Sequence, residues 1–227
     1  VGGLTITDTG TANVSVTALA ADTDLSNVSI AGNLTADYSA LSDVNFIGSL
    51  GTVAGTTTIN MASNQTLTAT AAKLTGLTIT DTGTANVSIT AIDVDTDLSG
   101  VDIAGTKTAT VATTKILTTA NLNGFDIDIA SGANLTGTDA QIGDLTITDA
   151  GENTTVTVTA IATNVDLSNI TLDGAGSTLA ATVTANTVLA GAANLHSASV
   201  NIADTFTLTA AASQVGGLTI TDTGTAN

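Results

Sequence analysis

The sequence contains no proline, no cysteine and no tryptophan, and aromatic residues make up only 2% of its 227 residues. The absence of cysteine excludes disulfides and thiolate metal sites. The absence of proline suits a chain whose backbone N–H groups are needed for hydrogen bonds between strands. Because a wide globular core usually relies on large aromatic side chains, their scarcity favours a narrow interior filled by Ala, Val, Leu and Ile.

Positive charge is almost absent as well. Three lysines (Lys73, Lys107 and Lys115) and no arginine stand against 20 acidic residues, which gives a net charge of −17. Nucleic-acid binding requires a basic surface, so this class of function is excluded. Anionic lipid surfaces would repel the chain, and no apolar run approaches the length of a membrane span. We therefore expect neither nucleic-acid partners nor membrane insertion.

What the sequence does have is threonine, serine and asparagine alternating with apolar residues. Residues 4–7 (LTIT), 14–17 (VSVT) and 155–159 (TVTVT) are examples. This period of two predicts half-buried β-strands. The alternation and a mean hydropathy of +0.41 argue against disorder, which is the other explanation for so polar a chain.

The sequence repeats at several levels. Residues 1–13 (VGGLTITDTGTAN) recur unchanged at 215–227, which gives a period of 214 (215 − 1). Related copies begin at Leu77 (LTITDTGTAN) and Leu145 (LTITDAGEN). They divide this period into three repeats of about 71 residues (214/3). We assign repeats to 1–73, 74–141 and 142–214, with the next period starting at 215–227. The identical ends lead us to expect a segment of a longer chain.

Each repeat contains a shorter pattern, apolar-x-x-apolar-x-apolar. Nine intervals within the full period predict about nine coils of about 24 residues (214/9). A second copy at Leu41 competes with the degenerate copy at Leu50 for the register of the second coil. The prediction is an all-β, right-handed parallel β-solenoid, in which each coil is stabilised by its neighbours. The pattern begins at Val1, Leu25, Leu50, Leu74, Leu98, Leu122, Ile142, Leu167, Leu195 and Val215.

Acidic corners raise the possibility of calcium. Asp93, Asp95 and Asp97 occupy alternate positions, and Asp22 and Asp24 lie at the corresponding corner of the preceding repeat. Calcium prefers six to eight oxygen ligands, so these carboxylates could form part of a site. The alternative is that the acidic corners only keep the protein soluble, and we expect no other cofactor.

We expect no enzymatic activity. His196 is the sole histidine, no G-x-S-x-G sequence occurs, and a carbohydrate-active β-helix would need more aromatic and basic residues to bind its substrate. An ice-binding face would need a regular, uncharged row of threonines. The central outward positions of the short pattern include Asp102 and Asp126, which argues against such a row.

Eight N-x-S/T sequons are present, and they would matter only in an organism that glycosylates asparagine. They lie at Asn13, Asn27, Asn33, Asn64, Asn86, Asn134, Asn153 and Asn169.

Residues 74–90 (LTGLTITDTGTANVSIT), 24–28 (DLSNV) and 97–101 (DLSGV) resemble the Thr/Ala-rich repeats of giant secreted bacterial surface proteins, which include adhesins and filament-forming proteins. The resemblance implies an extracellular or cell-surface location and a mechanical or adhesive role. We therefore expect a structural rod or filament, with the stalk of a calcium-stiffened adhesin as the alternative and a carbohydrate-active β-helix as a weaker one. The expected partner is another copy of the chain, through axial continuation of coils or lateral association.

Overall fold

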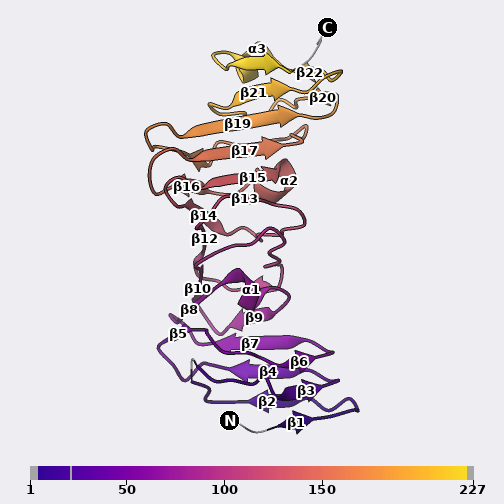
Figure 1. Ribbon diagram of the computed structural model, residues 1–227, viewed down its shortest axis with the longest axis vertical. Coiled ribbons are helices and arrows are strands. Elements are labelled where there is room, and N and C mark those ends of the chain that lie inside the picture. Colours follow the sequence, from indigo (N-terminus) through magenta and orange to yellow (C-terminus); the bar gives the residue numbers. More distant parts are fainter. Residues whose placement is uncertain (1–4, 21, 224–227) are drawn as a thin grey trace. The chain divides into compact units, whose positions relative to one another are not determined.

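The computed structural model describes residues 5–20 and 22–223 and confirms the parallel β-solenoid (Figure 1). Over these described residues the chain makes about 11 turns, and only 6% of them are helical. It divides into an N-terminal unit, Val1–Ile92 with Thr96–Thr108, and a C-terminal unit, Asp93–Asp95 with Ala109–Asn227. Among the described residues, no helix has the length and apolar character needed to cross a bilayer.

The N-terminal unit contains strands of three parallel sheets, in the orders β1-β3-β6, β2-β4-β7-β9-β11 and, as part of a seven-stranded sheet, β5-β8-β10. Its elements are β1 (Ile6–Thr7), β2 (Val14–Val16), β3 (Val28–Ile30), β4 (Leu34–Asp37), β5 (Asp43–Asn45), β6 (Thr52–Val53), β7 (Thr57–Met61), β8 (Thr66–Ala69), α1 (Ala71–Leu74), β9 (Thr78–Asp81), β10 (Asn86–Ile89) and β11 (Val101–Asp102). Strand β12 (Lys107–Val111) contains residues of both units.

The C-terminal unit also contains strands of three parallel sheets, in the orders β13-β15-β17-β19-β21-β23, β20-β22 and, as part of a seven-stranded sheet, β14-β16-β18. Its elements are β13 (Lys115–Ile116), β14 (Asp126–Ile129), β15 (Asn134–Thr138), α2 (Asp139–Ile142), β16 (Ile147–Asp149), β17 (Thr155–Thr159), β18 (Ile170–Thr171), β19 (Thr178–Val183), β20 (Thr187–Val188), β21 (Ser199–Ile202), β22 (Leu208–Thr209), α3 (Ala212–Val215) and β23 (Ile220–Asp222).

Strand register explains the alternation in the sequence. In the C-terminal unit Leu135 pairs with Val156 and Val156 with Leu179, and all three side chains are buried. Their neighbours Thr136 and Thr157 form the adjacent pair and point to the opposite face. Apolar residues are therefore stacked on apolar residues through successive turns, and hydroxyls on hydroxyls. This stacking removes the aliphatic side chains from water, which is the main stabilising contribution.

The turns are shorter and more numerous than the sequence pattern suggested. Asn86 pairs with Thr66, and Thr57 pairs with Leu34, so the sequence separation is 20 in the first pair (86 − 66) and 23 in the second (57 − 34). The pattern predicted longer coils because some of its intervals contain more than one turn. The interval from β6 to β9 is an example. The chain goes from β6 to β7 and then makes a full turn through β8 and α1 to β9, which lies in the same sheet as β7.

As a result, the 71-residue repeat moves its motif from one sheet to the next. The isoleucine of the LTIT motif lies in β1 as Ile6 and in β9 as Ile79, and these strands belong to different sheets of the N-terminal unit. In the C-terminal unit the same residue lies in β16 as Ile147 and in β23 as Ile220, again in different sheets. In each unit, the later copy lies in the sheet of the strand that directly follows the earlier copy. Strand β9 shares a sheet with β2, which follows β1, and β23 shares a sheet with β17, which follows β16. Equivalent positions of the repeat therefore do not form one straight row within a unit.

The largest side chains of the N-terminal core cluster where the sequence departs from the repeat. Tyr38 and Phe46 pack edge to face, with ring centroids 5.9 Å apart and an interplanar angle of 77°. Burial raises the pKa of Tyr38 to about 12. The buried side-chain amide of Gln65 donates hydrogen bonds to the carbonyl oxygens of Tyr38 (2.9 Å) and Leu41 (3.1 Å), which ties this irregular corner to the following turn.

Candidate functional site

The aspartate of the repeated TDTGTAN sequence holds the loop in which it lies. The Asp8 carboxylate accepts hydrogen bonds from the backbone N–H groups of Gly10 (2.9 Å) and Ala12 (3.0 Å). Asp81, at the equivalent place in the second repeat, accepts one from the N–H group of Ala85 (2.7 Å). Short polar side chains that bond nearby backbone groups in this way are typical of turns.

The third copy of this aspartate, Asp149, binds the next turn instead. Its carboxylate accepts hydrogen bonds from the backbone N–H groups of Asp173 (2.9 Å) and Gly174 (3.2 Å) and from the hydroxyl of Ser177 (2.6 Å). Hydrogen bonds to a charged acceptor are stronger than neutral ones. One carboxylate therefore fastens the loop over residues 173–177 to the turn before it.

Asparagines at the start of strands connect successive turns. The side-chain oxygen of Asn13 accepts a hydrogen bond from the N–H group of Asn33 (2.8 Å), and the Asn33 side chain accepts one from Thr56 (2.9 Å). In the C-terminal unit Asn134 accepts one from Thr155 (2.8 Å). Each bond satisfies a backbone donor just before or at the start of a strand, where the ladder itself offers no acceptor. Further bonds of this kind run from Thr106 to Asn86 and from Thr207 to Asn186.

These bonds explain many of the sequons. In four of them the asparagine bonds the next turn, the second residue is apolar and points inward, and the third carries an outward hydroxyl. These are the sequons at Asn13, Asn33, Asn86 and Asn134. A further two sequon asparagines, Asn64 and Asn153, have left-handed φ values of 60° and 59°, a backbone conformation that asparagine tolerates better than most residues. The N-x-S/T pattern thus has a structural cause that does not depend on glycosylation.

A second kind of corner uses Asp or Asn before a buried leucine. The Asp97 carboxylate accepts a hydrogen bond from the N–H group of Ser99 (3.0 Å), and the intervening Leu98 is fully buried. Hydrogen bonds from Ser99 also lower the pKa of Asp97. The same turn is formed by Asp24, Asn121, Asp166 and Asn194, which bond the N–H groups of Ser26, Asn123, Ser168 and His196.

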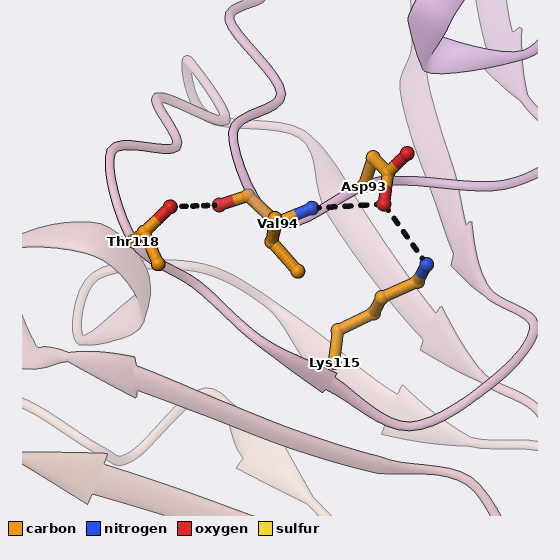
Figure 2. Close-up of polar contacts among 4 residues, drawn as sticks. All are labelled: Asp93, Val94, Lys115 and Thr118. Atoms are coloured by element: carbon orange, nitrogen blue, oxygen red, sulfur yellow. Dashed lines mark hydrogen bonds and ion pairs between the residues drawn. The ribbon is translucent and has the colours of Figure 1, made fainter.

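Asp93 forms an ion pair. Its carboxylate oxygen lies 3.1 Å from the Lys115 ammonium group and also accepts a hydrogen bond from the Val94 N–H group (3.1 Å), as Figure 2 shows. The hydrogen bond from Lys115 lowers the pKa of Asp93. Beside it, the Thr118 hydroxyl donates to the Val94 carbonyl oxygen (3.2 Å). Because the Asp93 side chain is 59% exposed, this pair contributes little to stability.

The five aspartates considered for calcium thus have different roles in the structure. Asp24 and Asp97 hold their own turns, Asp93 is paired with Lys115, and Asp22 and Asp95 are exposed. Within residues 5–20 and 22–223, no group of three or more acidic or histidine side chains is arranged to hold a metal ion.

Within the ranges that the structure describes, three one-turn helices form corners that sequence periodicity did not predict, because four residues are too few to show a helical period. The third residue of each helix reaches back to the preceding turn. The Lys73 ammonium group of α1 donates to the Gly48 carbonyl oxygen (2.8 Å), and the Gln141 amide of α2 donates to that of Thr118 (3.3 Å). The Gln214 amide of α3 donates to the Ala190 carbonyl oxygen. A recurring sequence pattern could have revealed these helices. Each lies at the end of an eight-residue segment that starts with Leu-Thr and ends with a polar residue followed by an apolar one, at 67–74 (LTATAAKL), 135–142 (LTGTDAQI) and 208–215 (LTAAASQV).

A surface concavity of about 370 Å³ in the C-terminal unit brings His196 and Asp173 together with Ser177, Ser197 and Ser199. His196 is exposed and has a left-handed φ of 50°. In the described part of the chain its imidazole forms no hydrogen bond with these residues. The groove therefore does not present the hydrogen-bonded base and nucleophile that a triad mechanism uses.

The outward faces of the C-terminal unit differ in charge. Sheet β14-β16-β18 exposes Asp126 and Asp128 on β14. Strands β15, β17, β19 and β21 contain no charged residue, and their outward side chains are mostly threonines. In Figure 1 these four strands lie one above another. The unit thus has one acidic sheet and a second sheet in which the four strands β15, β17, β19 and β21 are uncharged and rich in hydroxyls, with Lys115 on the flanking strand β13 and Asp222 on the flanking strand β23.

No family model, curated protein or solved structure matches this chain.

Proposed function

We propose that the protein is structural and extracellular, and that it forms part of a long rod or filament such as a cell-surface stalk, a sheath or a matrix fibre. The observation that carries this proposal is the use of the repeated polar residues. Asp8, Asp81 and Asp149 hold loops, Asn13 and Asn33 connect turns, and the helix-corner residues bond the preceding turn. Side chains that a catalytic or binding repeat would direct toward a ligand here maintain the solenoid.

The mechanical role follows from the hydrogen bonds. Parallel strands in successive turns bond along the direction in which turns are added, about 4.8 Å per turn. Side-chain bonds such as that from Thr56 to Asn33 add connections in the same direction. Tension along this axis would load many hydrogen bonds at once, and the absence of proline keeps the ladders continuous. The extracellular location rests on the resemblance to secreted surface repeats.

X-ray diffraction from oriented, concentrated protein tests the proposal together with electron microscopy of single particles. We expect elongated particles, an axial reflection near about 4.8 Å and slow digestion by broad-specificity proteases. Globular particles without that reflection would contradict the proposal. So would turnover of a polysaccharide substrate that a His196→Ala variant abolishes.

A further inference from the structure

The outward side chains of β15, β17, β19 and β21 form a surface that we call the threonine face. Thr136, Thr157, Ala180 and Ser199 form one row in register, and Thr182 continues the neighbouring row. The complete face comprises Asn134, Thr136, Thr138, Thr155, Thr157, Thr159, Thr178, Ala180, Thr182, Ser199 and Asn201. This register replaces the row inferred from the sequence, whose members lie in different sheets.

The face is suited to contact with another surface. The hydroxyls of Thr136, Thr157 and Thr182 form no hydrogen bond within residues 5–20 and 22–223, so they are available to a partner. Threonine is restricted at χ1, and little side-chain entropy is lost when it is immobilised. Ile116 of β13 pairs with Thr136 and extends the row with a side chain that is 63% exposed. Exposed apolar side chains of this size contribute to association when they are covered.

Electrostatics decides which partner fits. The chain carries a net charge of −17, so two copies repel each other wherever their carboxylates approach. The acidic sheet, with Asp126 and Asp128, would bring such groups together. Contact through the threonine face places uncharged strands against each other and keeps the acidic sheets apart.

We propose that the threonine face is the surface through which a second copy of this chain associates laterally, with hydroxyls bonded across the contact and Ile116 covered at its edge. This inference rests on the proposed filament function and names the face that joins neighbouring rods. Four strands of about five residues cover roughly 300 Å², well below the roughly 800 Å² per partner of a standard interface. A single copy should therefore associate weakly, and successive copies of the face along a longer chain would strengthen the contact by multivalency.

Sedimentation velocity over a range of protein and salt concentrations tests the inference with two matched variants. Thr157→Glu places a carboxylate in the threonine face, whereas Thr171→Glu makes the same change on β18 of the acidic sheet, where the paired residue on β16 is the uncharged Thr148. We expect the unmodified chain to self-associate, and more strongly at high salt because screening weakens the remaining repulsion. Thr157→Glu should raise the concentration needed for association at least about tenfold, equivalent to about 1.4 kcal/mol, and Thr171→Glu should change it less than about twofold. Circular dichroism checks that both variants fold.

Several results would overturn this inference. Equal effects of the two variants would show that net charge, not the face, controls association. Association that requires a divalent cation and disappears with EDTA would assign it to the carboxylates. A chain that stays monomeric under all conditions would also contradict it, and inhibition of ice growth by that monomer, lost in Thr157→Glu, would assign the face to crystalline water. Electron microscopy separates the two proposals, because elongated particles that do not associate leave the filament function intact.

Discussion

Sheet β14-β16-β18 and the sheet that contains β15, β17, β19 and β21 are built from the same turns of the C-terminal unit, and their inward faces are alike. Ile127 and Ile147 are stacked in the first, and Leu135 and Val156 in the second, all nearly completely buried. Their outward faces differ, with carboxylates on one and hydroxyls on the other. The interior must match the layers above and below it, whereas the exterior only has to remain compatible with a strand. Functional differences between the faces can therefore develop without a change of fold.

The acidic sheet also shows how charge is accommodated. Asp128 pairs with Thr148, which pairs with Thr171, so the carboxylate has an uncharged neighbour on β16. In the N-terminal unit Asp37 pairs with Asn60 in the same way. Like charges directly opposite each other on neighbouring strands are destabilising. The sheets thus carry carboxylates without stacking them in these rows.

Truncating an inward side chain should have the largest effect, and a similar one in both sheets. We expect Ile127→Ala and Leu135→Ala each to lower the free energy of unfolding by about 2–5 kcal/mol, because each leaves a cavity in a stacked layer. Urea denaturation measures the change. Thr148→Ala and Thr157→Ala are the outward controls and should change stability by less than about 0.5 kcal/mol. A large loss for either control would show that the outward positions are also structurally constrained.

A corner carboxylate should contribute more than one on the face of a strand. Asp149→Ala removes the acceptor of three hydrogen bonds and should lower the free energy of unfolding by about 1.5–3 kcal/mol. Asp128→Ala, its control on the acidic sheet, should leave stability unchanged or slightly raised because one negative charge is removed. Urea denaturation at neutral pH distinguishes them. Equal losses would contradict the distinction between corner and face carboxylates.

A smaller effect on stability is expected from substitutions in the turns that precede β18 and β21, one strand from each of the two sheets. Asp166 forms the turn before β18, and Asn194 forms the same turn before β21. Hydrogen bonds from Ser168 lower the pKa of Asp166 from its usual 3.8. Its contribution is therefore present above pH 3.8 and is lost as the pH falls through the lower pKa of the folded state.

Asp166→Asn should therefore keep the turn at neutral pH and reduce the loss of stability in acid. The reciprocal Asn194→Asp should increase that loss. Urea midpoints measured at neutral pH and below pH 3.8 provide the comparison. If both variants follow the unmodified chain at every pH, these turns do not contribute to the acid sensitivity.

Removal of divalent cations should have the smallest effect. We expect EDTA to leave the thermal unfolding midpoint unchanged, because the corner aspartates Asp24, Asp97 and Asp166 are bonded to their own turns. A large decrease in the midpoint, restored by calcium, would instead support the calcium-stiffened adhesin stalk.

Much of the fold could be predicted from the sequence because alternation reports directly which side chains point inward. Register could not, because corners of different length separate strands with similar patterns. The copies at Leu41 and Leu50 illustrate this limit. Only the structure shows that β6, which follows Leu50, pairs with β3, so this copy lies in the same sheet as the preceding one, with Val53 opposite Ile30. Knowledge of the register then identifies the threonine face, which the sequence spacing had obscured.

The corner aspartates were harder to interpret. Closely spaced carboxylates such as Asp95 and Asp97 suggest a cation site when the partners of each one are unknown. The informative signal was the presence of asparagine at the equivalent corners Asn121 and Asn194. A neutral amide can replace a carboxylate that accepts a backbone hydrogen bond, but it is a weaker ligand for a cation. No sequence pattern indicated the ion pair between Asp93 and Lys115, because these residues lie 22 positions apart and meet only when neighbouring turns stack.

The transfer of the LTIT motif from sheet to sheet has a consequence for how such a chain can lengthen. A repeat that equalled a whole number of turns would place every copy of its aspartate above the previous one, and each added copy would enlarge a column of like charge. Here the repeat length is not a whole number of turns. Asp81 therefore ends β9 and Asp149 ends β16, in sheets different from those of the neighbouring copies in their units. Duplication of the repeat can then extend the chain while its charge is shared among the faces.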